Sequence, residues 1–192
     1  NGAMVVNQRA TSVTATGYTV DRWSYNGSQT SKATVAQSSI APTGFINSLG
    51  VTSSSAYSIT SGDYFTLEQP IEGLNCTDLA WGTANAKTVT LSFWVRSSLT
   101  GTFGGFLTNA SFNRAYPFTY TINSANTFEQ KTVTIAGDTS GTWIGATNGL
   151  GLMVRFSLGS NYTGTAGAWA GGYIDAPTGQ TNLVGTNGAT FY

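Results

Sequence analysis

The sequence predicts an all-β domain, a sandwich or barrel of antiparallel strands, and two observations carry this prediction. Apolar residues recur at every second position in several stretches, which is the spacing of a strand with one buried face. Clusters rich in Gly, Asn, Asp and Ser separate these stretches, and such residues favour tight turns. Many short strands divided by turns are typical of sandwiches and barrels.

The clearest strands are predicted at residues 88–96 and 150–156. In the first, the core-facing side chains are Val89, Leu91, Phe93 and Val95, and the outward ones are Thr88, Thr90, Ser92, Trp94 and Arg96. In the second, Leu150, Leu152, Val154 and Phe156 point one way, while Met153 and Arg155 point the other. Each pattern is a clean alternation, as expected of strands buried on one face.

Further strands are expected at 17–25, 32–39, 57–60, 64–71, 102–108, 114–122, 132–135 and 187–192. The segment 71–81 breaks the period of two. Leu74, Asp78 and Trp81 fall at helical spacing within it, so we expect one short helix there. Residues 157–186 are rich in glycine and predict a long connection with a specific role. No shift in composition divides the chain, which predicts one domain over residues 1–192.

Composition excludes several classes of function. Only 8% of the 192 residues are charged, the formal net charge is zero, and no Lys/Arg run occurs, which argues against a duplex nucleic-acid partner. No apolar run has the length of a membrane span. The chain still has 40% hydrophobic and 12% aromatic residues, which is enough for a core. An almost uncharged, strand-rich chain is expected at an extracellular or particle-bound surface.

Catalytic chemistry is hard to place. The chain has no histidine, which excludes Ser–His–Asp and Cys–His nucleophiles, and its lone Cys76 is expected to be a small buried hydrophobe. A carboxylate pair is the remaining route, as in glycoside hydrolysis. The candidates are Asp21, Asp63, Glu68, Glu72, Asp78, Glu129, Asp138 and Asp175. Most have structural explanations, so we expect no catalytic residues, no metal and no cofactor.

Sugar binding fits the sequence better. Proteins hold sugars with aromatic faces and planar hydrogen-bonding side chains, and Trp94, Arg96 and Arg155 all lie on outward phases of predicted strands. These three are the candidate binding residues. The alternative is that Trp94 packs under a loop or a subunit contact, with the arginines paired to Glu68, Glu72 or Asp78. The other tryptophans at 23, 81 and 143 are expected in the core or as loop anchors.

Several short sequence segments together resemble those of a known family. They are Asn1–Met4 with Asn7–Arg9, Tyr18–Trp23, Thr90–Ser98, Glu129–Trp143, Gly179–Leu183 and Phe191–Tyr192. In this order they resemble a jelly-roll module of tail-fibre and other appendage proteins of bacteriophages, notably marine ones. The layout is also similar to carbohydrate-binding jelly rolls. The resemblance narrows the fold to a two-sheet antiparallel jelly-roll sandwich.

The resemblance also carries expectations about function. It implies a non-catalytic virion appendage domain for structural display, host-surface glycan attachment or both, located on the virion surface or extracellularly. The alternatives are a carbohydrate-binding module of a secreted bacterial glycan-active enzyme, and a glycoside hydrolase using a carboxylate pair. The expected partners are other virion proteins, a cell-surface glycan, and further copies of the chain in a homo-oligomer. The resemblance implies a trimer. Neither a nucleic-acid partner nor membrane insertion is expected.

Two departures from the family pattern matter. Relatives often hold a structural calcium ion with an acidic residue of the opening strand, and the matching position here is Val5, which offers no oxygen ligand. We therefore do not carry the metal over. The family's closing strand would still be running at Tyr192, so we expect the natural chain to continue beyond both ends.

Overall fold

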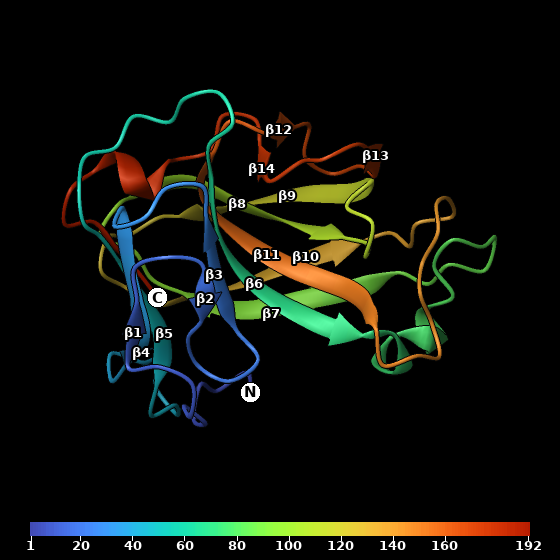
Figure 1. Ribbon diagram of the computed structural model, residues 1–192, viewed down its shortest axis with the longest axis horizontal. Helices are drawn as coiled ribbons and strands as arrows, with labels where there is room; N and C mark the ends of the chain where they lie inside the picture. Colours follow the sequence, from blue (N-terminus) through green and yellow to red (C-terminus); the bar gives the residue numbers. More distant parts are fainter.

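Two antiparallel sheets form the two layers of a sandwich in the computed structural model, which describes all residues from 1 to 192 (Figure 1). The larger sheet has seven strands in the order β13-β9-β8-β11-β6-β3-β2. Their bounds are β2 Gly17–Tyr18, β3 Ser24–Gly27, β6 Tyr64–Glu72, β8 Gly101–Thr108, β9 Arg114–Ile122, β11 Leu150–Ser160 and β13 Ala170–Gly171.

The second layer is assembled from two smaller sheets. One has the order β1-β4-β5-β15, and the other pairs β10 with β7. An antiparallel bridge between Ser97 and Phe191 joins them, so β15 sits between β5 and β7. The bounds are β1 Ser12–Val13, β4 Ala33–Ser38, β5 Ser48–Ser53, β7 Val89–Val95, β10 Glu129–Ile135 and β15 Thr190–Phe191. Together they make a layer of six strands, and the predicted jelly-roll sandwich is confirmed.

The core lies between the two layers and follows the predicted alternation. Phe93 points inward, where its ring lies 5.0 Å from that of Tyr120 and 4.9 Å from that of Phe156, measured between centroids. Its neighbour Trp94 points outward and is 42% exposed. The inward side chains of β9, including Phe118 and Tyr120, are buried as well. The register predicted for residues 88–96 is therefore confirmed.

The tryptophans at 23, 81 and 143 act as predicted. Trp23 and Trp81 are buried in the core cluster. Trp81, Trp143 and Trp169 pack edge to face, with centroids 4.9 to 5.3 Å apart. The indole N–H groups of Trp143 and Trp169 donate to the carbonyls of Ser140 and Ala136, which anchors two loops at one end of the sandwich.

The prediction of one short helix at 71–81 is wrong, because the helical turns found there are of the 3₁₀ type and are separate. The segment forms two single-turn 3₁₀ helices, η1 (Gly73–Asn75) and η2 (Thr77–Leu79), and a third, η3 (Leu183–Gly185), lies near the end of the chain. The two turns do not join into one helix because the backbone of Cys76 between them is not helical (φ −133°, ψ 8°), and Ala80 in the left-handed region (φ 53°) ends the second turn. The N–H groups of Gly73 and Leu74 donate to carbonyls of Gly149 and Thr147 on a neighbouring loop.

Other boundaries also differ from the predictions. β5 (Ser48–Ser53) was not predicted, and residues 57–60, predicted as a strand, form none. The Gly-rich region 157–186 begins as the end of β11 and then crosses the outer face of the seven-stranded sheet. It contributes β13 and a short parallel pair, β12 (Thr163–Gly164) with β14 (Ala176–Pro177), seen above β8 and β9 in Figure 1. Gly104 permits this crossing, because a Cβ there would collide with Pro177. None of the helices is long and apolar enough to cross a membrane.

Candidate functional site

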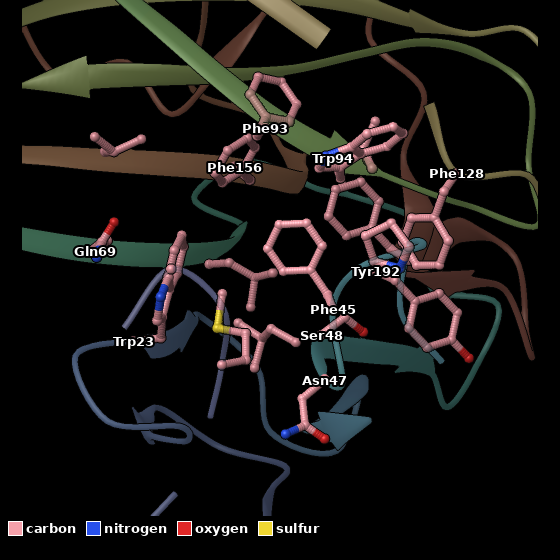
Figure 2. Close-up of a pocket in the computed structure, with 18 of the residues that line it drawn as sticks. Trp23, Phe45, Asn47, Ser48, Gln69, Phe93, Trp94, Phe128, Phe156 and Tyr192 are labelled. Carbon is pink, nitrogen blue, oxygen red and sulfur yellow. The ribbon is translucent and has the colours of Figure 1, made fainter. Parts of the chain in front are cut away.

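An open cleft of about 290 Å³ lies in the six-stranded layer, between β5 and β7 (Figure 2). Its lining includes residues of β5 and β7 in this layer and inward side chains of β6 and β11 in the other layer, namely Ser48, Leu49, Leu91 to Val95, Leu67, Gln69, Val154 and Phe156.

Aromatic rings dominate the walls of this cleft. They come from loops and strands that are far apart in sequence: Trp23, Phe45, Phe93, Trp94, Phe128, Phe156, Phe191 and Tyr192. Four polar side chains are interspersed with them, namely Asn47, Ser48, Gln69 and Ser92. Figure 2 shows Trp94, Phe128 and Tyr192 gathered at one end of the cleft, with Trp23 and Gln69 at the other.

Trp94 lines this cleft, and Arg96 contacts two of its aromatic walls. Trp94 lines it and remains 42% exposed, because the alternation of β7 directs the ring away from the core. The Arg96 guanidinium lies 5.1 Å from the ring centroid of Tyr192 and 6.0 Å from that of Phe128, and its Nε donates to the carbonyl oxygen of Asn126 at 2.8 Å. Arg96 thus holds the rings of Phe128 and Tyr192, which line the cleft, in place by cation–π contacts.

Arg155 lies elsewhere. It is on the outward phase of β11, as predicted, but in the opposite sheet, and its side chain is only 3% exposed. Its guanidinium forms salt bridges with Glu68 at 2.8 Å and Asp175 at 3.0 Å. The segment that crosses the outer face of the sheet covers it. Of the three predicted binding residues, only Trp94 lines the cleft. Arg96 contacts two of the rings that line it, and Arg155 is a buried structural charge paired with Glu68, as the alternative prediction stated.

Most acidic side chains also have structural partners. Asp138, 2% exposed, accepts two hydrogen bonds of 2.7 Å from Arg114. Glu72 accepts a similar pair from Arg22, which holds the pKa of Glu72 near 2. Hydrogen bonding to an ionised carboxylate favours that form, so such groups are poor proton donors at neutral pH.

Asp63 shows the same effect within a turn. Burial alone would raise its pKa, but hydrogen bonds from Thr60, Tyr57 and Ser28 outweigh burial and hold the pKa far below its usual range. Asp63 therefore acts as the hub of this turn, as its Gly/Ser surroundings indicated.

One carboxylate pair does converge, but not in a form that serves glycoside hydrolysis. Glu68 and Asp175 bind the same Arg155 guanidinium and are 7% and 0% exposed in their side chains. A glycosidase needs its two carboxyl groups on either side of an accessible sugar bond. Here a guanidinium occupies the space between them.

The cleft residues that the sequence did not reveal come mostly from loops. Phe45, Asn47 and Phe128 lie outside any periodic stretch, and nothing local marks them. Tyr192 had a signal: it follows the inward Phe191 by one residue, so strand alternation turns it outward. Its pairing with Arg96, through main-chain hydrogen bonds of 2.8 and 3.0 Å in the two directions, is non-local and cannot be derived from the sequence pattern.

Comparison with known proteins gives structural neighbours only, since the sequence matches no family model and no curated protein. Similar solved structures include the enzymatically active domain of tailspike protein 4 of bacteriophage CBA120, with 14% identity and a TM-score of 0.47. That match covers 90% of this chain and 18% of the tailspike chain, so the domain spans less than a fifth of its length.

Carbohydrate-binding modules are also among the similar structures. A CBM4 module has 13% identity and a TM-score of 0.41, with 89% of each chain covered. The family 11 module from Clostridium thermocellum, solved with a β-1,3-1,4-mixed-linked tetrasaccharide, has 11% identity and a TM-score of 0.42, covering 81% of this chain and 92% of that one. The neighbours are thus of the two kinds that the sequence resembles, and the proposals below rest on this chain's own residues.

Proposed function

We propose that this chain is a non-catalytic domain of a virion appendage, displayed on the virion surface or extracellularly, that attaches to host-surface glycans through the aromatic cleft. The observation that carries the proposal is the convergence of Trp94, Phe128 and Tyr192 at one open cleft that also holds amide side chains. Ligand pockets are typically apolar with a few well-placed polar groups, and this cleft has that composition.

The chemistry of the cleft suits a pyranose ring. A sugar offers an apolar C–H face, which packs against an aromatic ring, and a rim of hydroxyls, which require donors and acceptors. Trp94 presents a large, accessible ring against which the C–H face can pack. Asn47 and Gln69 are partly exposed amides that both donate and accept, so they can form hydrogen bonds with the hydroxyls. The chain's net charge of zero favours neutral glycans over strongly acidic ones.

A glycan array tests this function with three proteins. The wild type is expected to bind at least one neutral glycan class. Trp94→Ala is expected to lose that binding while keeping its fold, since the ring is largely outside the core. Tyr18→Ala is the matched control, because Tyr18 is 49% exposed and does not line the cleft. Absence of any glycan ligand, or equal binding by Trp94→Ala, would contradict the proposal.

We also propose that the domain assembles into a homo-oligomer, a trimer by the family expectation, because few of its residues are charged and its net charge is zero. Light scattering tests this proposal, and a monomer at micromolar concentration would contradict it.

A further inference from the structure

Three ionised side chains are buried on the outer face of the seven-stranded sheet. Arg155 of β11 forms a salt bridge from Nη2 to Oε1 of Glu68 on β6 at 2.8 Å, and its Nη1 donates a hydrogen bond to Asp175 at 3.0 Å. The side chains of Arg155, Glu68 and Asp175 are 3%, 7% and 0% exposed. The guanidinium is enclosed by the rings of Phe112 and Phe106, at 4.7 and 5.2 Å from their centroids. We call these three residues the buried triad.

The buried triad has one negative charge more than it can neutralise, since two carboxylates share one guanidinium. Glu68 is well satisfied: its Oε1 also accepts from Thr66 Oγ1 at 2.9 Å and Asn26 Nδ2 at 3.2 Å. Asp175 is less well satisfied: its Oδ1 accepts from Arg155 Nη1, its buried Oδ2 has no hydrogen-bond partner of good geometry, and the nearby Tyr173 phenol is the one other group that favours its charged form. A buried ionised oxygen without a donor is costly, and binding a proton removes the charge.

Asp175 belongs to the segment that crosses the sheet, residues 161–178, which we call the crossing segment. Its two arms are tied together where the N–H groups of Asp175 and Ala176 donate to the carbonyl of Tyr162 at 2.8 and 3.1 Å. The rings of Tyr162 and Tyr173 also pack edge to face, with their centroids 5.0 Å apart. The Asp175 side chain is the charged link between this segment and the sheet beneath it.

We propose that Asp175 takes up a proton in the folded protein between pH 7 and pH 5, and that the crossing segment is a latch which acidification tightens onto the seven-stranded sheet. In the protonated form Asp175 still accepts the bond from Arg155, while the triad becomes neutral as a whole. In the ionised form the excess charge remains buried, and release of the segment exposes Asp175 to water. Acidification therefore favours the closed segment.

The titration is consistent with this geometry. Burial raises the pKa of Asp175 to about 6, the positive charge of Arg155 and the nearby Tyr173 phenol oppose the rise, and the negative charge of Glu68 adds to it. The groups that face Asp175 are Arg155, Glu68 and the phenols of Tyr162 and Tyr173. Burial raises the pKa of the Tyr173 phenol, so that ring stays neutral in this range, and Arg155 stays charged.

Few other groups titrate between pH 7 and pH 5, because the chain has no histidine. The pKa of Glu72 and of Glu129 lies near 2, so these carboxylates titrate well below the window. The sign follows from linkage. A folded pKa above the unfolded value of 3.8 means that the folded state binds more protons between about pH 4 and 6. The stability therefore rises as the pH falls from 7 through 6 and is lost as the pH rises.

Thermal unfolding of the whole chain at pH 7, 6 and 5 tests the proposal. The wild-type melting temperature is expected to rise by at least about 3 °C from pH 7 to pH 5. Asp175→Asn is expected to abolish the pH dependence, and Asp78→Asn, which changes an exposed acid, is expected to retain it. A flat or falling wild-type curve, or a rise that survives in Asp175→Asn, would overturn the proposal.

Two further measurements keep the test decisive if Asp175→Asn fails to fold. A carboxyl ¹³C titration of the wild type is expected to give Asp175 an apparent pKa well above 4, and a value below 4 would overturn the proposal. Glu68→Gln removes the like charge and is expected to shift the titration of Asp175 to lower pH. Hydrogen exchange of residues 161–178 is expected to slow on acidification by more than the intrinsic pH effect, whereas an unchanged opening equilibrium would contradict the latch.

Discussion

Adjacent residues of β7 are expected to differ sharply in their contribution to stability. Phe93→Ala removes a ring that contacts Tyr120 and Phe156 at centroid distances of 5.0 and 4.9 Å and also lies 6.4 Å from Phe118. Burial of a phenylalanine and the cavity that its loss leaves together amount to about 3–5 kcal/mol. Because the cleft leaves part of this ring uncovered, we expect a value near the lower end, about 3 kcal/mol.

Trp94→Ala is the matched comparison. Its ring is 42% exposed and points away from the core, so we expect a loss of about 1 kcal/mol or less in the free energy of unfolding. Urea unfolding of both variants, followed by circular dichroism, measures the difference directly. If Trp94→Ala is as destabilising as Phe93→Ala, the register of β7 is displaced by one residue, since such a slip exchanges the two faces of a strand. The assignment of Trp94 to the cleft would then be wrong as well.

Two further predictions concern charges and metals. Arg114→Ala leaves the carboxylate of Asp138, 2% exposed, without its cation, and we expect the free energy of unfolding in urea to fall by about 3 kcal/mol. The control is Arg9→Ala, which removes the more exposed ion pair with Asp21 and should lower the free energy of unfolding by less than about 1 kcal/mol. Equal losses in the two variants would refute the distinction. Chelator treatment is expected to leave the melting temperature unchanged, because no group of three or more metal-ligating side chains is brought together, and a fall of more than about 4 °C would reveal a bound ion.

The predictions from sequence succeeded where structure is local. Strand alternation placed Phe93 inside and Trp94 outside, because the period of two depends only on neighbouring residues. β5 was missed because the glycine at position 50 interrupts its short apolar pattern, and its pairing with β4 and β15 is what defines it. The segment 71–81 forms two 3₁₀ turns instead of the predicted helix because Cys76, between the turns, has a non-helical backbone and Ala80 ends the second turn.

The candidate site shows the same division. The sequence identified Trp94 and Arg96 through their outward phase on one strand. It could not show that Phe128 and Tyr192 would stack on Arg96, since both contacts join segments that are distant along the chain. It also could not show that Arg155 would be covered. Outward phase on a strand predicts exposure only when nothing crosses the sheet, and residues 161–178 do cross it.

NMR mapping of a glycan from the array most directly tests the proposed attachment through the cleft. The ¹⁵N-labelled domain is titrated with that glycan, and shifts are followed for the indole N–H of Trp94, the side-chain amides of Asn47 and Gln69, and the main-chain amides of β7. We predict that the largest shifts cluster at these groups, with intermolecular contacts from the sugar C–H face to the Trp94 ring. Shifts confined to Tyr64, Tyr162 and Tyr173, on the outer face of the opposite sheet, would contradict glycan binding at the cleft.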